Sequence, residues 1–93
     1  MPGYDRAELT AELTVVPSPD AESPPREQVE AAKRAASDSG LAREAGPKVT
    51  VLAGGRREVL EASLRVIEAA IDAGAHAVEA RVEAEEEAER FGR

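Results

Sequence analysis

Apolar and polar positions follow two different periods along the chain, and the longest regular pattern predicts a helix over 57–73. At about 100° per residue, two adjacent rows of this helix are mainly apolar and the charged residues fall opposite them. The apolar face is wide, which predicts a helix that lies on a sheet with Leu64 at the centre of the buried face. Gly74 is expected to end this helix in a left-handed conformation. The rows are Leu60, Leu64, Ile67 and Ile71 beside Val59, Ser63, Val66 and Ala70.

Alternation with a period of two predicts strands in the remaining segments. Residues 7–16 alternate with one buried face, and residues 48–53 are more continuously apolar, which is typical of a central strand. Residues 41–45 are short, charged and followed by Gly46-Pro47, which favours an edge strand. Residues 75–84 alternate with one wet face and also predict an edge strand. Three threonines, Thr10, Thr14 and Thr50, are expected on the sheet face away from the helices.

A second helix is predicted between the first two strands. Ser23 suits its N-cap and Pro24 its first helical position, since proline needs no hydrogen bond for its missing N–H there. The helix should run to Ser39, and Gly40 should take the left-handed position after it. Its inner face is mostly alanine, so it can approach its neighbours closely while burying little area.

The resulting order β-α-β-β-α-β predicts an α+β protein with the ferredoxin-like arrangement, in which a four-stranded antiparallel sheet carries two helices on one face. Right-handed crossovers put the first and third strands in the middle. We expect one domain over residues 7–84, with a lead-in at 1–6 and an acidic tail at 85–93.

The apolar residues are numerous but small. Nineteen are alanine and only seventeen are Leu, Ile or Val. Such a core is modest beside the backbone entropy lost on folding. Association with a partner subunit is therefore expected.

Charge and composition exclude several classes of function. A net charge of −7 and a pI near 4.7 argue against nucleic acid, because no basic stripe is present. The chain has no cysteine and one histidine, which excludes disulfides, thiolate chemistry and His-pair metal sites. No apolar run is long enough to span a membrane. We therefore expect a cytoplasmic protein with no membrane segment, no metal and no cofactor.

Candidate chemistry is sparse. Gly54-Gly55-Arg56-Arg57 at a helix start could hold an anion, but a plain turn and helix cap is favoured because the phosphate-loop spacings are missing. Glu79 and Glu83 flank Arg81 on one side of an edge strand, which favours a solvated ion-pair row over a catalytic carboxylate pair. His76 is expected to be exposed. No pair of nucleophile and base can be proposed, so no catalytic residue is assigned and an enzyme is not expected.

Several spaced turn and strand residues carry a family resemblance. Ser39-Gly40-Leu41, Gly46-Pro47, Thr50-Val51-Leu52 with Gly54, and Gly74-Ala75 closely resemble the small thiamine-binding, YkoF-like domains, over roughly residues 8–84. The resemblance implies a non-catalytic ferredoxin-like domain that forms homodimers or homotetramers and binds thiamine or its hydroxymethylpyrimidine part. It places the ligand near Thr50, with loop residues such as Ser18 nearby.

Three positions depart from the family pattern, and one of them is Ile67, which stands where the second helix often carries a histidine. Ala53 stands where the family usually has glutamate, and Arg43 stands where it often has an aromatic residue. These changes remove a carboxylate and a stacking ring that a thiazolium and a pyrimidine would use. The leading hypothesis is a small-molecule binding domain with part of the family site, Thr50, Ser18, Ala53 and Arg43, altered. The alternative is an oligomeric scaffold, or a binder of another ligand, that has lost thiamine binding.

Overall fold

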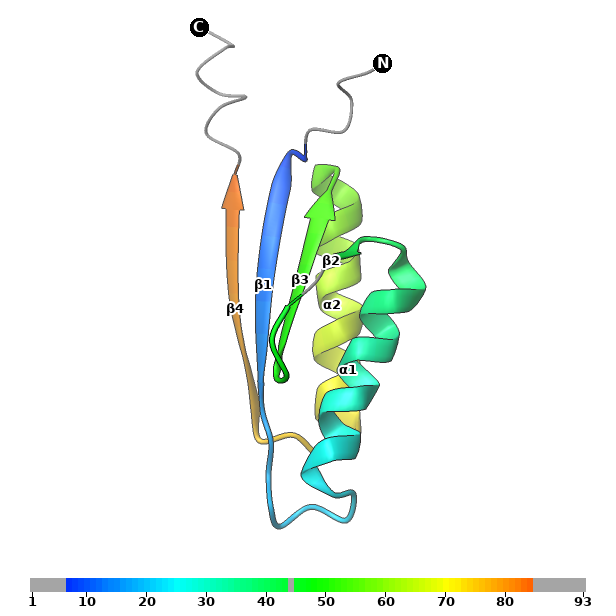
Figure 1. Cartoon of the computed structure of the whole chain (residues 1–93), viewed down its shortest axis with the longest axis vertical. Helices are drawn as coiled ribbons and strands as arrows, with labels where there is room; N and C mark the ends of the chain where they lie inside the picture. The colour runs from blue at the N-terminus through cyan, green and yellow to red at the C-terminus, as the bar shows by residue number, and fades with distance from the viewer. Residues whose placement is uncertain (1–6, 44, 85–93) are drawn as a thin grey trace, which may run out of the picture.

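The computed structural model describes residues 7–43 and 45–84, so the expected lead-in at 1–6 and tail at 85–93 lie outside the described residues. Figure 1 shows the order of the elements along the chain. They are β1 (Leu9–Val16), α1 (Pro25–Ser39), β2 (Ala42–Arg43), β3 (Val49–Gly54), α2 (Arg56–Asp72) and β4 (Ala77–Ala84).

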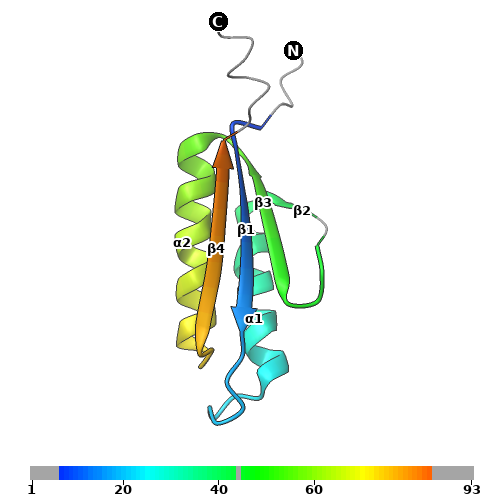
Figure 2. The same cartoon turned by 90° about the vertical axis from the view of Figure 1, so that its left-hand side faces the viewer.

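The four strands form one antiparallel sheet in the order β2-β3-β1-β4. Leu9 of β1 pairs with Gly54 of β3 on one side and with Ala84 of β4 on the other. Both helices cover the same face of the sheet (Figure 2). The fold is therefore the predicted α+β, ferredoxin-like βαββαβ arrangement, with β1 and β3 central and β2 and β4 at the edges.

The first helix begins one residue later than the sequence predicts. Pro24 is the N-cap, with extended φ and ψ of −66° and 156° and no side-chain cap bond, and Pro25 opens the helix. Pro25 has the φ that the first helical residue requires, and it has no N–H that would be left without a partner there. The helix therefore starts at Pro25, and Pro24 takes the cap position predicted for the serine. At the other end, Gly40 takes a left-handed φ of 78° as predicted. The Ser39 hydroxyl then accepts a 3.0 Å bond from the Leu41 N–H and fixes the exit of the chain.

The second helix is rotated relative to the prediction. Of its two apolar rows, the smaller one is buried, and Val59 and Val66 are fully covered. Three members of the larger row are at the surface, with Leu60, Leu64 and Ile71 exposed by 48%, 59% and 46%, and the fourth, Ile67, is half-buried against the core. The prediction that Leu64 lies at the centre of the buried face is therefore wrong. The rotation buries Ala62 on the opposite flank, where α2 packs closely against α1.

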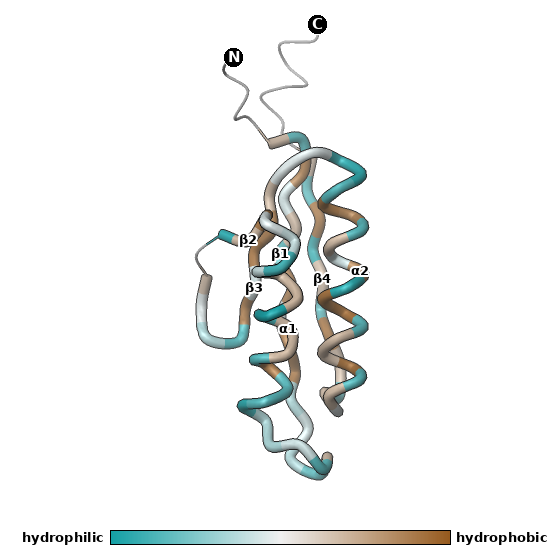
Figure 3. Tube along the Cα trace, turned by 90° about the vertical axis from the view of Figure 1, so that its right-hand side faces the viewer, coloured by the Kyte–Doolittle hydropathy of each residue, from teal (hydrophilic) through white to brown (hydrophobic). Residues whose placement is uncertain are grey.

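The core lies between the sheet and the helices and consists of a few branched side chains among alanines. Leu13, Val15 and Leu52 from the sheet meet Val59 and Val66 from α2. Alanines at 32, 36, 62 and 70 belong to the same buried cluster. The two helices run beside each other on the sheet (Figure 3). Because small side chains let the helices approach closely, the layer is compact although it buries few large groups.

Thr50 belongs to this interior and not to the open face predicted for it. It pairs with Leu13, whose side chain is buried beneath the helices, and partners in register share a face of the sheet. The residue is 4% exposed. Thr10 and Thr14 lie on the other face, where alternation with the buried Ala11 and Leu13 places them.

Gly74 ends α2 with a φ of 107°, which confirms the predicted left-handed position. A Cβ added there would come within 2.7 Å of the Ala21 Cβ. Glycine is therefore needed both for the backbone conformation and for the close approach of the loop between β1 and α1.

Candidate functional site

A pocket of about 150 Å³ opens where α1 meets the β2–β3 edge of the sheet. It is lined by Lys33, Ala36, Ala42, Arg43 and Thr50. The Thr50 hydroxyl is buried and has no hydrogen-bond partner among the described residues. A buried hydroxyl without a partner costs about 1–3 kcal/mol, so a group that bonds to it would be favoured at this position.

Lys33 fixes one wall of the pocket. Its ammonium donates to the carbonyl of Gly46 at 3.0 Å and to the carbonyl of Val49 at 2.6 Å. These bonds tie α1 to the turn that leads into β3, where Val49 N–H donates to Gly46 C=O at 3.3 Å. Because Thr50 follows Val49 directly, the same contacts hold the Thr50 backbone in place.

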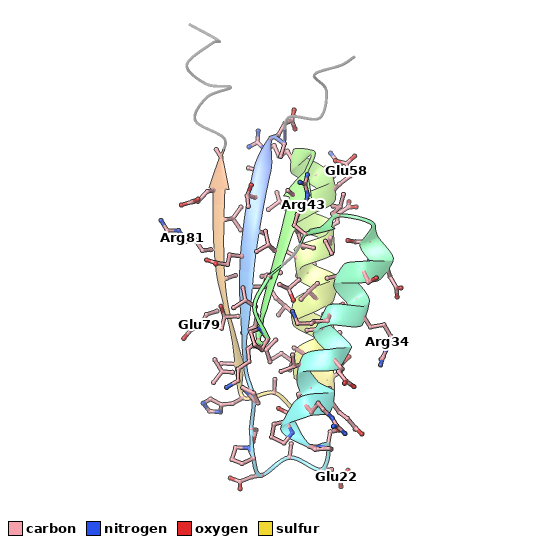
Figure 4. All side chains as sticks on the ribbon, viewed as in Figure 1. Glu22, Arg34, Arg43, Glu58, Glu79 and Arg81 are labelled. Atoms are coloured by element: carbon pink, nitrogen blue, oxygen red, sulfur yellow. The ribbon has the colours of Figure 1, made fainter. Side chains whose placement is uncertain are left out.

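The pocket has a positive lining. Lys33 lies on α1, Arg43 projects from β2 (Figure 4), and the other three lining residues are uncharged. Two of the three donor sites of the Lys33 ammonium are already used by backbone carbonyls, whereas the exposed Arg43 guanidinium makes no ion pair recorded among the described residues. The arrangement suits a ligand that offers hydrogen-bond acceptors and carries no positive charge.

The structure separates the four predicted site residues into three locations. Thr50 and Arg43 line the same pocket. Ala53 lies on the open face of the sheet, where it pairs with Thr10. Ser18 lies in the loop between β1 and α1 and is not among the residues that line this pocket. Their roles as ligand contacts remain predictions.

The backbone of Ser18 is already hydrogen-bonded to the side chain of Gln28. This glutamine is fully buried, and its Oε1 accepts a 2.8 Å bond from the Ser18 N–H. Its Nε2 donates to the carbonyls of Ser18 and Ser23, both at 2.9 Å. Sequence reasoning missed this residue, although Gln28 lies four residues before Ala32 and eight before Ala36, on the same inner row of α1.

The start of α2 is occupied by the chain's own carboxylate. Glu8 Oε1 accepts a 2.9 Å hydrogen bond from the Arg56 N–H. A hollow of about 450 Å³ lies alongside, lined by Glu8, Arg56, Arg57, Glu58 and Leu60. Acidic and basic groups alternate around it. The helix start is therefore a capped turn, as favoured from the sequence.

The charged row of β4 is an ion-pair row at the surface. Arg81 and Glu83 form a salt bridge of 2.8 Å, with both side chains more than half exposed. Figure 4 shows Glu79 and Arg81 pointing away from the helices. His76 is exposed as predicted, and its backbone N–H donates to Val16 C=O at 2.9 Å. Within residues 7–43 and 45–84, no cluster of three or more acidic, histidine or cysteine side chains could hold a metal.

Comparison with solved structures shows what the fold is similar to. The chain is similar to a domain of unknown function, DUF77, from Bacillus cereus, with a TM-score of 0.65 and 27% identity, over 83% of this chain and 73% of that one. No family model and no curated protein matches the chain. Among the described helices, none is long and apolar enough to cross a membrane. The similarity supports a small ferredoxin-like domain.

Proposed function

We propose that the chain is a non-enzymatic domain that binds a small molecule in the pocket between α1, β2 and β3. The buried, unpaired Thr50 hydroxyl is the observation that carries this proposal. Polar groups in protein interiors are nearly always paired, and the exceptions often mark a place that a ligand or water completes. A water can pair the hydroxyl as well, so ligand binding must be measured directly.

The ligand class follows from size and charge. A pocket of about 150 Å³ is smaller than the roughly 300–1,000 Å³ of sites that take drug-sized ligands. It therefore suits a single ring with polar substituents. Lys33 and Arg43 repel a cation at this position, so we propose that hydroxymethylpyrimidine binds better than thiamine, whose thiazolium is positively charged.

The family resemblance supports the choice of ligand to be tested first. It rests on Thr50, Gly54 and the turn residues around them, and it implies binding of thiamine or hydroxymethylpyrimidine. The Bacillus cereus domain shares the architecture, but its function is unknown. The family glutamate position, Ala53, lies on the face of the sheet opposite Thr50, so its loss does not change the lining of this pocket.

Calorimetric titration with hydroxymethylpyrimidine and with thiamine tests the proposal. Thr50→Val keeps the shape of the side chain and removes the hydroxyl. We expect it to weaken binding about two- to tenfold while leaving the fold intact, since one hydrogen bond to an uncharged partner contributes about 0.5–1.5 kcal/mol. Thr14→Val, on the open face, is the matched control and should leave affinity unchanged.

Two results would contradict the proposal. One is hydroxymethylpyrimidine affinity that is equal in the parent and Thr50→Val proteins. The other is tighter binding of thiamine than of hydroxymethylpyrimidine, because the positive lining would then not face the ligand. Absence of binding for both compounds would favour the alternative, in which the chain is an oligomeric scaffold or binds another ligand.

A further inference from the structure

The largest apolar side chains at the surface gather in one place. Among the described residues, Leu60, Leu64, Ile71 and Val82 are the large hydrophobic side chains exposed by more than two fifths. The first three follow one row of α2, at spacings of four and seven residues that keep them on the same flank. We call these four residues the α2–β4 strip.

The topology brings this row of α2 next to β4. The right-handed connection from β3 to β4 carries α2 across β1, so one flank of α2 faces α1 and the other faces the β4 edge. Ala62 lies on the flank that faces α1, and Leu64 lies on the other flank. Val82 faces the helix layer because it pairs with the buried Ala11, yet it is 43% exposed. The helix side of β4 is thus left partly uncovered beside the exposed leucines.

The outer edge of β4 also has backbone groups that no strand among the described residues pairs with. Val15 N–H donates to Lys48 C=O on the β3 side, so alternate residues of β1 bond to β3 and the others bond to β4. By the same alternation, Val78, Ala80 and Val82 direct their N–H and C=O groups away from β1. The strand has eight residues with neither proline nor glycine. Its charges at Glu79, Arg81 and Glu83 alternate in sign, so they oppose pairing with an unmatched strand but permit pairing with a strand of complementary charge.

We propose that the α2–β4 strip is the docking surface for a second copy of this chain, joined by antiparallel pairing of β4 with the partner's β4. The charge pattern of the strand is self-complementary about Ala80. Pairing centred on that residue places Glu79 opposite the partner's Arg81, and the reverse, on the open face. Centring the pair on Arg81 instead would oppose two arginines and would place glutamate against glutamate.

The same register brings the two apolar rows together. Val78 lies opposite the partner's Val82 on the helix side, and the two-fold axis turns the α2 flanks toward each other. Leu60 then faces the half of the partner's α2 that carries the partner's Ile71. One interface would cover all four members of the strip and satisfy the outward backbone groups. A second copy of the chain would therefore cover the α2–β4 strip and pair with the outer edge of β4 at the same time.

Light scattering coupled to size exclusion tests the proposal on the full chain. Two variants attack the interface at different points. Leu64→Asp places a carboxylate in the apolar row, and Ala80→Pro removes an outward N–H at the centre of the pairing without touching a bond to β1. Each should weaken dimerisation at least about thirtyfold, because both copies carry the change at one symmetric interface.

Matched controls lie next to these positions. Arg65→Asp alters the neighbouring exposed residue of α2 outside the row, and Ala42→Pro alters the opposite edge strand. Both proteins should remain dimeric. Circular dichroism verifies that each variant is folded, and Leu64→Asp alone decides the question if a proline variant fails this check.

A parent protein that is monomeric at about 100 µM overturns the proposal, since its dimer would then be weaker than about −5.5 kcal/mol. A dimer that survives both Leu64→Asp and Ala80→Pro also overturns it, because association would then use another face. A tetramer that falls to a dimer in these two variants alone supports the strip as one of its interfaces.

Discussion

The two helices cover the same face of one sheet but complete its two edges differently. Beside α1, the edge strand β2 has two residues and the buried polar group Gln28 finds all its partners within the chain. Beside α2, the edge strand β4 has eight residues, and leucines stand at the surface next to it. On the α1 side the buried glutamine is fully hydrogen-bonded, whereas on the α2 side apolar side chains are exposed and the outward backbone groups of β4 have no partner among the described residues.

The domain therefore has two kinds of surface at which groups lack a partner among the described residues. On the α1 side it is one hydroxyl, Thr50, in a small positive pocket, which suits a small polar ligand. On the α2 side it is a long strip of apolar side chains with an open strand edge, which suits a protein partner. Substitutions on the two sides should therefore be separable, one set changing ligand affinity and the other changing assembly.

The largest expected effect distinguishes the two rows of α2. Val66→Asp puts a carboxylate in a site with no solvent exposure and should lower the free energy of unfolding by about 3–5 kcal/mol. Leu64→Asp, at 59% exposure, should change it by less than about 1 kcal/mol when the chain is dilute enough to be monomeric. Chemical denaturation measures both values. Equal losses would mean that the rows are not divided into buried and exposed as described.

A smaller loss is expected for the polar network of the α1 side. Gln28→Leu leaves the Ser18 N–H and the carbonyls of Ser18 and Ser23 without their side-chain partner. We expect a loss of about 2–3 kcal/mol, since these groups are only part-buried and water can replace some of the bonds. Glu27→Leu, at the exposed neighbouring position, removes only a carboxylate of the first helical turn and should cost less than about 1 kcal/mol. A neutral Gln28→Leu would show that the loop is held by other contacts.

The smallest effect concerns the turn that leads into β3. Lys33→Met keeps the long apolar stem and removes the two bonds to Gly46 and Val49. Stability should fall by about 1–2 kcal/mol, and amide exchange at the Gly46–Val49 turn should accelerate. Arg34→Met changes a side chain that points outward from α1 (Figure 4) and should do neither. If amide exchange is unchanged in Lys33→Met, the lysine does not hold the turn, and its assigned role in fixing the pocket wall is wrong.

Most of the fold follows from the sequence because its signals are local. Period-two and helical patterns define the elements, and Gly40 and Gly74 end the helices in the conformation that glycine permits. The order of strands then follows from the handedness of the two crossovers. The shift at the start of α1 is a single residue, because two adjacent prolines offer equivalent starts.

The rotation of α2 and the position of Thr50 could not be predicted from the sequence pattern in the same way. Leu60 and Val59 are both apolar, so periodicity alone cannot decide which row is buried. Which row is buried depends on the packing of α2 against α1. The small side chains of α1 allow close packing, and Ala62 of α2 is buried in the same cluster. Likewise, residues 48–53 form a nearly continuous apolar run, and such a run does not show which face holds Thr50 until its pairing with Leu13 is known.

The central place of β1 has a consequence for the order of folding. The first strand of the chain pairs with β4, the last, so closing this ladder brings together two segments that are separated in sequence by both helices and β3. Contacts between distant segments cost loop-closure entropy before they add stability, and they slow folding. Until β4 pairs, that edge of β1 is open to any matching strand, so we expect β4 of a neighbouring chain to compete with the chain's own at high concentration. Folding at low concentration therefore favours the intended intramolecular ladder over exchange of strands between copies.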